Sequence, residues 1–114
     1  MNPILSRRAV VAGGLAGAFA GLGGAGAQEA WPNKSITLVV PFTPGGSTDI
    51  LARIIGQKFN AAWGQGVVVD NRPGAGGSSG TTQIARATPD GYTIGMGHIG
   101  TLSVNPTLYK NLQY

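Results

Sequence analysis

The sequence predicts an α/β fold in which parallel strands alternate with helices. Three short apolar runs rich in β-branched residues are bounded by glycine and proline, and apolar residues at helical spacing lie between the first two runs. Near-continuous apolar runs are typical of strands that are covered on both faces, as in a parallel sheet. The order strand, helix, strand, helix, strand indicates a βαβαβ unit with right-handed crossovers.

Three strands are expected along the chain. Residues 36–40 form a β-branched run that ends before a proline, which cannot donate a hydrogen bond to a neighbouring strand. Residues 67–69 are consecutive valines and form the second strand. The third strand covers residues 92–97 and is entered through residues 89–91, a Pro-Asp-Gly turn signal.

The first predicted helix begins at Ser47 or Thr48, either of which can cap it, and ends near Gly64. Asp49 lies in its first turn, where the helix dipole favours an acidic side chain. Apolar residues at helical spacing predict the buried stripe, and polar residues predict the side that faces water. The stripe comprises Leu51, Ile54, Ile55, Phe59 and Ala62, and the polar side comprises Arg53, Gln57 and Asn60.

A second, shorter helix is expected over residues 78–87. Ile84 and Ala85 are the residues expected to pack inward from it. This helix leads from the second strand to the third, so it supplies the second crossover of the βαβαβ unit.

Residues 1–27 are predicted to be a cleavable signal peptide. Arg7 and Arg8 supply a basic start, residues 9–24 are uncharged and rich in Ala, Gly, Val and Leu, and residues 25–27 give the small-x-small pattern that signal peptidase accepts. Cleavage is therefore expected after Ala27, and the mature protein is expected in the periplasm.

The alternative for this segment is a transmembrane anchor, because residues 9–27 are 19 uncharged residues, about the span of a bilayer. Seven glycines make the segment a poor helix, so no stable membrane anchor is expected. Ser6, Arg7 and Arg8 before a weakly apolar stretch also indicate a twin-arginine signal. The general secretory route stays open, because it tolerates paired arginines too.

The composition excludes several classes of protein. The 114 residues include no cysteine, which excludes a disulfide framework, thiolate metal sites and a cysteine nucleophile. Residues 28–114 carry six basic and four acidic side chains, a net charge of +2, and the basic residues are scattered singly. A nucleic-acid-binding protein usually shows a clustered basic patch with interleaved aromatics, so no nucleic-acid partner is expected.

Two glycine-rich turns connect a strand to a helix, over residues 41–49 and 72–80. Both share one design: glycine lets the bare backbone approach a ligand, and the helix that follows presents unpaired N–H groups and a partial positive charge. In an open α/β sheet, ligands bind beyond the carboxyl ends of the strands, where both turns lie. The two turns therefore predict a carboxylate or phosphate ligand. The alternative is that the glycines only permit tight turns.

No enzyme, metal site or cofactor is expected from these residues. Gly74, Gly76 and Ser79 miss the third glycine of the dinucleotide fingerprint, and residues 45–48 lack the lysine of a phosphate-binding P-loop. His98, the single histidine, has neither a cysteine partner nor metal-ligand spacing around it. A nucleotide-binding α/β enzyme of dehydrogenase type is kept as an alternative function, with a non-binding structural module as the third.

Residues 31–49 resemble the opening of Bug-type (TctC-like) solute-binding proteins, the extracytoplasmic receptors of tripartite tricarboxylate transporters, and the resemblance continues through residues 67–77, 87–93 and 105–112. It implies a periplasmic-binding-protein-like (type II) fold of two α/β lobes that close on a small organic acid. Family members run to roughly three hundred residues, a two-domain length. The resemblance therefore also implies that residues 28–114 are the N-terminal βαβαβ part of the first lobe.

The resemblance also implies the binding site and the partners. In the family, loops that lead from strands to helices hold the carboxylate of the ligand. The implied partners are a small carboxylate and the membrane subunits of a tripartite tricarboxylate-type transporter, and no cofactor is implied. The implied ligand contacts are Phe42, Thr43, Gly45, Gly46, Ser47, Asp49, Gly76, Gly77, His98, Gly100 and Thr101.

Overall fold

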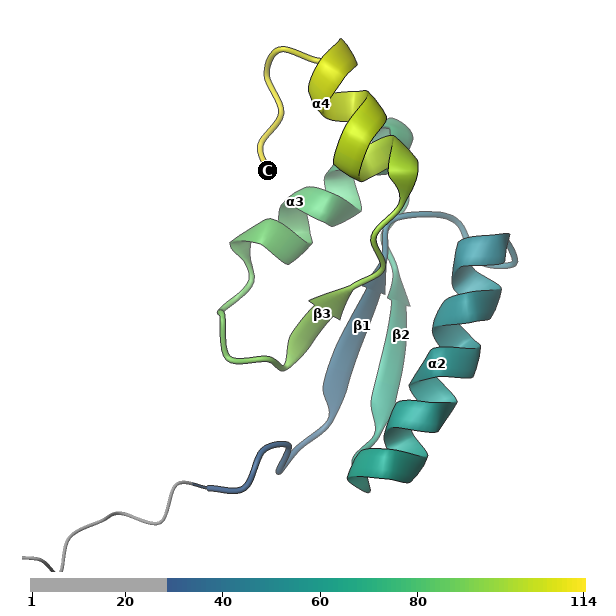
Figure 1. Ribbon diagram of the computed structural model, residues 1–114, viewed down its shortest axis with the longest axis vertical. Coiled ribbons are helices and arrows are strands. Elements are labelled where there is room, and N and C mark those ends of the chain that lie inside the picture. Colours follow the sequence, from purple (N-terminus) through teal and green to yellow (C-terminus); the bar gives the residue numbers. More distant parts are fainter. Residues whose placement is uncertain (1–28) are drawn as a thin grey trace, which may run out of the picture.

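Three parallel strands form one sheet in the computed structural model, which describes residues 29–114 (Figure 1). Strand β1 spans Ile36–Val40, β2 spans Val67–Asn71 and β3 spans Thr93–Gly95. Their order across the sheet is β2-β1-β3, so the first strand is central. The predicted signal peptide, residues 1–27, lies outside the described residues.

Helices α2 and α3 connect the strands. Helix α2 spans Ser47–Trp63 and leads from β1 to β2, and α3 spans Ser78–Arg86 and leads from β2 to β3. Because β2 and β3 flank β1 on opposite sides, crossovers of the same hand carry these helices to opposite faces of the sheet. Helix α2 packs on β1 and β2, whereas α3 packs on β1 and β3, and Figure 1 shows one helix on each side of the sheet. The predicted βαβαβ order is confirmed.

The apolar core lies between the sheet and α2. Leu38 and Val40 of β1 are 2% and 0% exposed and cluster with Ala52 of α2. Partly buried apolar side chains pack against this cluster: Phe42, Val67, Val69, Ile94 and Met96. Ile36 and Val39 of β1 are also fully buried, so the central strand is covered on both faces, as is typical of a parallel sheet.

The buried stripe predicted for α2 is wrong in part, because the helix approaches the sheet through small residues. Ala52 and Gly56 are its buried apolar positions, and a Cβ on Gly56 would lie 3.4 Å from Val67 Cγ1. Larger residues beside them are turned outward, with Leu51 53% and Ile54 50% exposed. Ile55 and Phe59 are partly buried as expected, Ala62 is exposed, and Arg53, Gln57 and Asn60 are exposed as expected.

Helix α3 packs on the sheet through Gly80, Thr81 and Ile84. The first two are buried, and Ile84 lies directly on Gly95 of β3, where it leaves no room for a side chain. The inward position of Ile84 confirms the prediction, whereas Ala85, which was also expected to face inward, is exposed. The inner stripe follows helical spacing from Gly80 to Ile84, and Ala85 falls just outside it.

The chain after β3 is mostly helical. The third strand is shorter than the predicted residues 92–97, because β3 pairs with β1 only over Thr93–Gly95. A π-helix, η2, spans Gly100–Val104 and continues into α4, Asn105–Leu108. The sequence does not predict this helical segment, because the glycine and proline in it are poor helix formers. Neither this helix nor any other within residues 29–114 has both the length and the apolar character needed to cross a bilayer.

Candidate functional site

Three loops meet at the edge of the sheet where the parallel strands end. The first covers residues 41–46, the second residues 72–77 and the third residues 96–99, and each directly follows one strand. Because the carboxyl ends of parallel strands lie at one edge, this topology collects the three loops there. All of the predicted ligand contacts belong to these loops or to the first helical turns that follow them.

Phe42 links the three loops. Its ring lies 4.7 Å from the ring of His98, measured between centroids. A Cβ on Gly77 would lie 3.1 Å from Phe42 Cζ and 2.6 Å from Thr101 Cγ2. Gly77 is therefore packed tightly between the first loop and η2. The structure brings these four predicted site residues together.

The first loop leads to backbone donors at the start of α2. Gly46 is the N-cap residue, and the first helical hydrogen bond runs from Ile50 N–H to the Gly46 carbonyl at 3.0 Å. Among the described residues, no acceptor receives the N–H groups of Ser47 and Thr48, and no side chain caps the helix. These donors carry the partial positive charge of a 17-residue helix. The chain is exposed where they begin, at Thr43, Gly45, Gly46 and Ser47.

Asp49 shapes the first loop from inside. It is 3% exposed, and its Oδ2 accepts hydrogen bonds from Gly45 N–H at 2.9 Å and Arg53 Nε at 3.0 Å. Its Oδ1 accepts a hydrogen bond from Asn71 Nδ2 at 3.0 Å. The hydrogen bond from Arg53, followed by those from Gly45 and Asn71, lowers the pKa of Asp49 to about 2. Because both carboxylate oxygens are used inside the protein, the geometry gives this residue a positioning role rather than a ligand contact.

Asn71 is a site residue that the sequence did not single out. It is the last residue of β2, and its Nδ2 donates to the Phe42 carbonyl at 3.2 Å as well as to Asp49. It thereby ties the first loop to the end of the neighbouring strand. The sequence offers one weak signal, a polar residue after a run of valines, but 22 positions separate Asn71 from Asp49.

The second loop differs from the first, although the sequence predicted one design for both. Gly74, Ala75, Gly76 and Gly77 all have positive φ, between +47° and +129°. The N–H groups of Gly77 and Ser79 both donate to the Gly74 carbonyl, at 2.9 and 3.4 Å. Donors that were expected to be free for an anion are therefore partly used within the loop, and the first loop is the better candidate for binding one.

Asn105, the first residue of α4, holds the second loop from outside. It is 6% exposed, and its Nδ2 donates to the Gly76 carbonyl at 3.1 Å and to Ser78 Oγ at 3.3 Å. The sequence did not single out Asn105, so this bridge between the second loop and the helix after β3 was not predicted.

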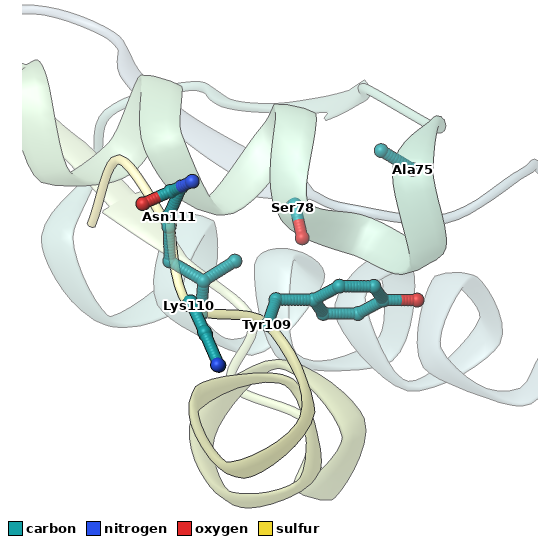
Figure 2. Close-up of a pocket in the computed structure, with 6 residues that line it drawn as sticks. Ala75, Ser78, Tyr109, Lys110 and Asn111 are labelled. Carbon is teal, nitrogen blue, oxygen red and sulfur yellow. The ribbon is translucent and has the colours of Figure 1, made fainter.

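A cavity of about 400 Å³ lies beside the second loop (Figure 2). It is lined by Ala75, Ser78 and residues 109–112, and Figure 2 shows the ring of Tyr109 alongside Ser78. None of the predicted ligand contacts lines this cavity. We therefore place the candidate site at the first loop and the Phe42 contacts, where free donors are available.

The third loop is organised by its own backbone. His98 Nδ1 accepts a hydrogen bond from Gly100 N–H at 3.0 Å, and Thr101 Oγ1 donates to the His98 carbonyl at 3.0 Å. Thr101 is buried, at 1% exposed, whereas His98 is exposed. With Nδ1 as acceptor, the imidazole keeps Nε2–H as the donor that can reach a ligand. Within residues 29–114, no three His, Cys, Asp or Glu side chains are placed to hold a metal ion.

Replacing Ala75 with glycine should stabilise the protein. Ala75 begins the short 3-10 helix η1, Ala75–Gly77, and is the only non-glycine residue with positive φ in the described chain. A left-handed conformation costs an L-residue about 1–2 kcal/mol more than glycine. Glycine loses more entropy on folding, and this offsets part of the gain. We therefore expect Ala75→Gly to raise the free energy of unfolding by about 0.5–1 kcal/mol, measured by urea denaturation. Ala87→Gly is the matched control and should lower it, because Ala87 has φ −66°; the same sign for both variants would contradict the prediction.

A family model described as "Tripartite tricarboxylate transporter family receptor" matches residues 51–114. Among curated relatives, the chain is 42% identical over 88 residues to "UPF0065 protein in the TAR-I ttuE-ttuC' intergenic region" of Agrobacterium vitis, covering 77% of this chain and 25% of that protein. It is 44% identical over 77 residues to "Protein BugT" of Bordetella pertussis, covering 68% of this chain and 24% of that protein. The chain thus spans about a quarter of the length of the curated relatives it matches.

Solved structures of similar proteins share this fold. The periplasmic binding protein BugD matches with a TM-score of 0.70 and 49% identity over 74% of this chain and 28% of that one. Rpa4515 of R. palustris, solved with adipate, matches with a TM-score of 0.72 and 41% identity over 75% and 28%. MatC from Rhodopseudomonas palustris, solved with malate, matches with 0.70 and 40% over 74% and 29%. These neighbours confirm the predicted periplasmic-binding-protein-like α/β fold for the matched part.

Proposed function

The chain belongs to the tripartite tricarboxylate transporter receptor family, and we propose on that basis that it serves in a periplasmic receptor that captures a small organic acid. The captured carboxylate would be passed to the membrane subunits of a tripartite tricarboxylate-type transporter or to a sensor. The relatives that were solved with adipate and malate support a dicarboxylate as the first ligand class to test. On this proposal the protein binds its ligand without chemical change and is not an enzyme.

The observation that carries this proposal is the uncapped start of α2. The N–H groups of Ser47 and Thr48 have no hydrogen-bond acceptor among the described residues, and the helix dipole adds a partial positive charge there. A carboxylate placed at such a helix start receives charge-assisted hydrogen bonds without a basic side chain.

We assign the predicted contacts to roles by their geometry. The exposed first-loop residues Thr43, Gly45, Gly46 and Ser47 would contact the carboxylate directly. Phe42 and His98 would form an aromatic wall, since their rings touch edge to face. Asp49 and Thr101 are buried and would position the others. Gly76, Gly77 and Gly100 would contribute backbone at the second and third loops.

We further propose that residues 1–27 direct export and are removed after Ala27, and that residues 28–114 form part of the first of two lobes. The basic start and small-x-small end of residues 1–27 support export. The match to 28% and 29% of the solved chains supports a partial lobe. N-terminal sequencing of the protein recovered from the periplasm tests the cleavage position, and a mature form that begins elsewhere would contradict it.

A thermal-shift screen of the full-length protein tests the ligand class. Mono-, di- and tricarboxylates are compared with nucleotides at equal concentration. A carboxylate that raises the melting temperature with a saturable concentration dependence supports the receptor. Stabilisation by nucleotides alone would favour a nucleotide-binding enzyme, and no response to any compound would favour a structural module.

The variant Ser47→Pro isolates the backbone donor. Ser47 is the first residue of α2, where proline is well tolerated, and the extended Gly46 before it, with ψ 170°, suits a residue that precedes proline. The variant loses one N–H donor with little change to the helix. We expect carboxylate binding to weaken by about tenfold or more, the value of one charge-assisted hydrogen bond, with an unchanged melting temperature of the free protein.

Ser47→Ala is the control for that variant, because it removes the hydroxyl and keeps the N–H donor. Calorimetric titration with malate and adipate measures both variants. If Ser47→Pro and Ser47→Ala bind equally well, the backbone N–H of Ser47 does not contact the ligand, and the site assigned here is wrong.

A further inference from the structure

Three side chains form a closed ring of hydrogen bonds behind the first loop. Asp49 accepts from Arg53 Nε at 3.0 Å and from Asn71 Nδ2 at 3.0 Å. Arg53 closes the ring by donating from its Nη2 to Asn71 Oδ1 at 3.4 Å. Each of the three side chains therefore contacts the other two, although they come from two turns of α2 and from the end of β2.

This ring also forms hydrogen bonds with the backbone of the first loop at two points. Asp49 Oδ2 accepts from Gly45 N–H at 2.9 Å, and Asn71 Nδ2 donates to the Phe42 carbonyl at 3.2 Å. The loop between Phe42 and the helix start is thus held at both ends. Since the Phe42 ring also packs against His98 and Gly77, a shift of this loop would reach the second and third loops.

The charges in the ring matter for an anionic ligand. Asp49 places a buried negative charge in the first turn of the same helix whose start is proposed to receive a carboxylate. Alone, that charge would repel the ligand and cancel part of the helix dipole. Arg53 lies one turn later and pairs with it, so the ring as a whole is neutral toward the site.

We propose that the Asp49–Arg53–Asn71 ring is the positioning element of the carboxylate site, in which Arg53 neutralises Asp49 so that the exposed donors of α2 attract an anion. Arg53 raises carboxylate affinity on this proposal without touching the ligand. The proposal rests on the receptor function given above, and it assigns a role to Arg53 and Asn71, which the family resemblance did not name as contacts.

Substitutions of Arg53 in the full-length protein separate charge from packing. We measure the dissociation constants of malate and adipate by calorimetry at about 20 mM and about 500 mM salt, since salt screens the repulsion between Asp49 and a ligand that lies at the solvent-exposed first loop. Arg53→Met leaves Asp49 unneutralised and should bind about tenfold more weakly than wild type at low salt, with the ratio shrinking to about threefold or less at high salt. Arg53→Lys keeps the charge and should stay within about threefold of wild type at low salt.

Arg86→Met is the matched control. Arg86 is an exposed arginine at the end of α3 that donates to Gln113, and its loss should leave the affinity unchanged at both salt concentrations. The proposal is overturned if Arg53→Met binds like wild type. It is also overturned if Arg53→Met and Arg53→Lys lose the same affinity at both salt concentrations, because the role of Arg53 would then be packing alone.

Amide hydrogen exchange at Gly45 tests the ring independently of any ligand. The Gly45 N–H should be protected in wild type. Asn71→Leu removes the hydrogen bonds that Asn71 donates to Asp49 and to the Phe42 carbonyl, and it should speed exchange at Gly45 by about tenfold or more. Unchanged exchange would overturn the ring as a positioning element. If wild type binds no carboxylate but Asn71→Leu still speeds exchange at Gly45, the receptor function fails while the ring as a structural clamp stands.

Discussion

Gly80→Ala should be among the most destabilising single-methyl additions in the protein, although alanine is the better helix former. Gly80 lies in α3, and a Cβ there would lie 2.6 Å from the Arg72 carbonyl oxygen and 2.7 Å from Pro41 Cα. Both atoms belong to the backbone, so no side chain can rotate away. We expect a loss of about 2–4 kcal/mol in the free energy of unfolding, because relief requires α3 to move off the end of β1.

Gly56→Ala is the matched control, since it makes the same change in the other helix with the opposite expected sign. A Cβ on Gly56 would lie 3.4 Å from Val67 Cγ1 and 3.8 Å from Val69 Cγ2, which is ordinary contact. Helix propensity then dominates, and the variant should gain about 0.5–1 kcal/mol. Urea denaturation of both variants in the full-length protein measures the pair. A gain in both would show that α3 has more room than the structure gives it.

The order of strands and helices could be predicted from the sequence because it depends on local signals. The β-branched run that becomes β1 and the valines of β2 lie where expected, and α3 begins at the predicted Ser78. The prediction that Ser47 or Thr48 caps α2 is wrong, because Gly46 is the N-cap residue and Ser47 is already helical. The facing of α2 could not be predicted the same way. The pattern gives weight to large apolar residues such as Leu51 and Ile54, whereas the helix faces the sheet through the small Ala52 and Gly56.

In the candidate site too, local features could be predicted from the sequence and long-range contacts could not. The glycine-rich first loop and the approximate start of α2 follow directly from the sequence, because a strand, a proline and two glycines mark them. The side chains that hydrogen-bond to the loops do not follow from the sequence. Asn71 and Asn105 reach Phe42 and Gly76 across 29 positions each, and only the topology of the sheet brings such residues together. A sequence pattern predicts where a loop is, but not which distant side chain holds it.

Asp49→Asn should destabilise the fold more strongly than the loss of an exposed carboxylate. Asp49 offers acceptors to three donors, from Gly45, Arg53 and Asn71. An amide replaces one acceptor oxygen with a donor, so at least one of these N–H groups would face another N–H in a buried position. We expect a clear drop in the urea midpoint near neutral pH. Asp90→Asn is the control, because exposed Asp90 accepts one bond from Tyr92 N–H that an asparagine oxygen can also accept.

The pH dependence of this variant identifies the charge as the cause. The hydrogen bonds from Arg53, Gly45 and Asn71 lower the pKa of Asp49 from 3.8 to about 2 in the folded protein. A group whose pKa falls on folding stabilises the fold above its unfolded pKa, and this stabilisation is lost as the pH falls through the folded pKa. The difference in urea midpoint between wild type and Asp49→Asn should therefore be full near neutral pH and shrink as the pH falls from about 4 towards about 2. A difference that stays constant over that range would mean that shape, and not the ionised carboxylate, holds the first loop against the end of β2.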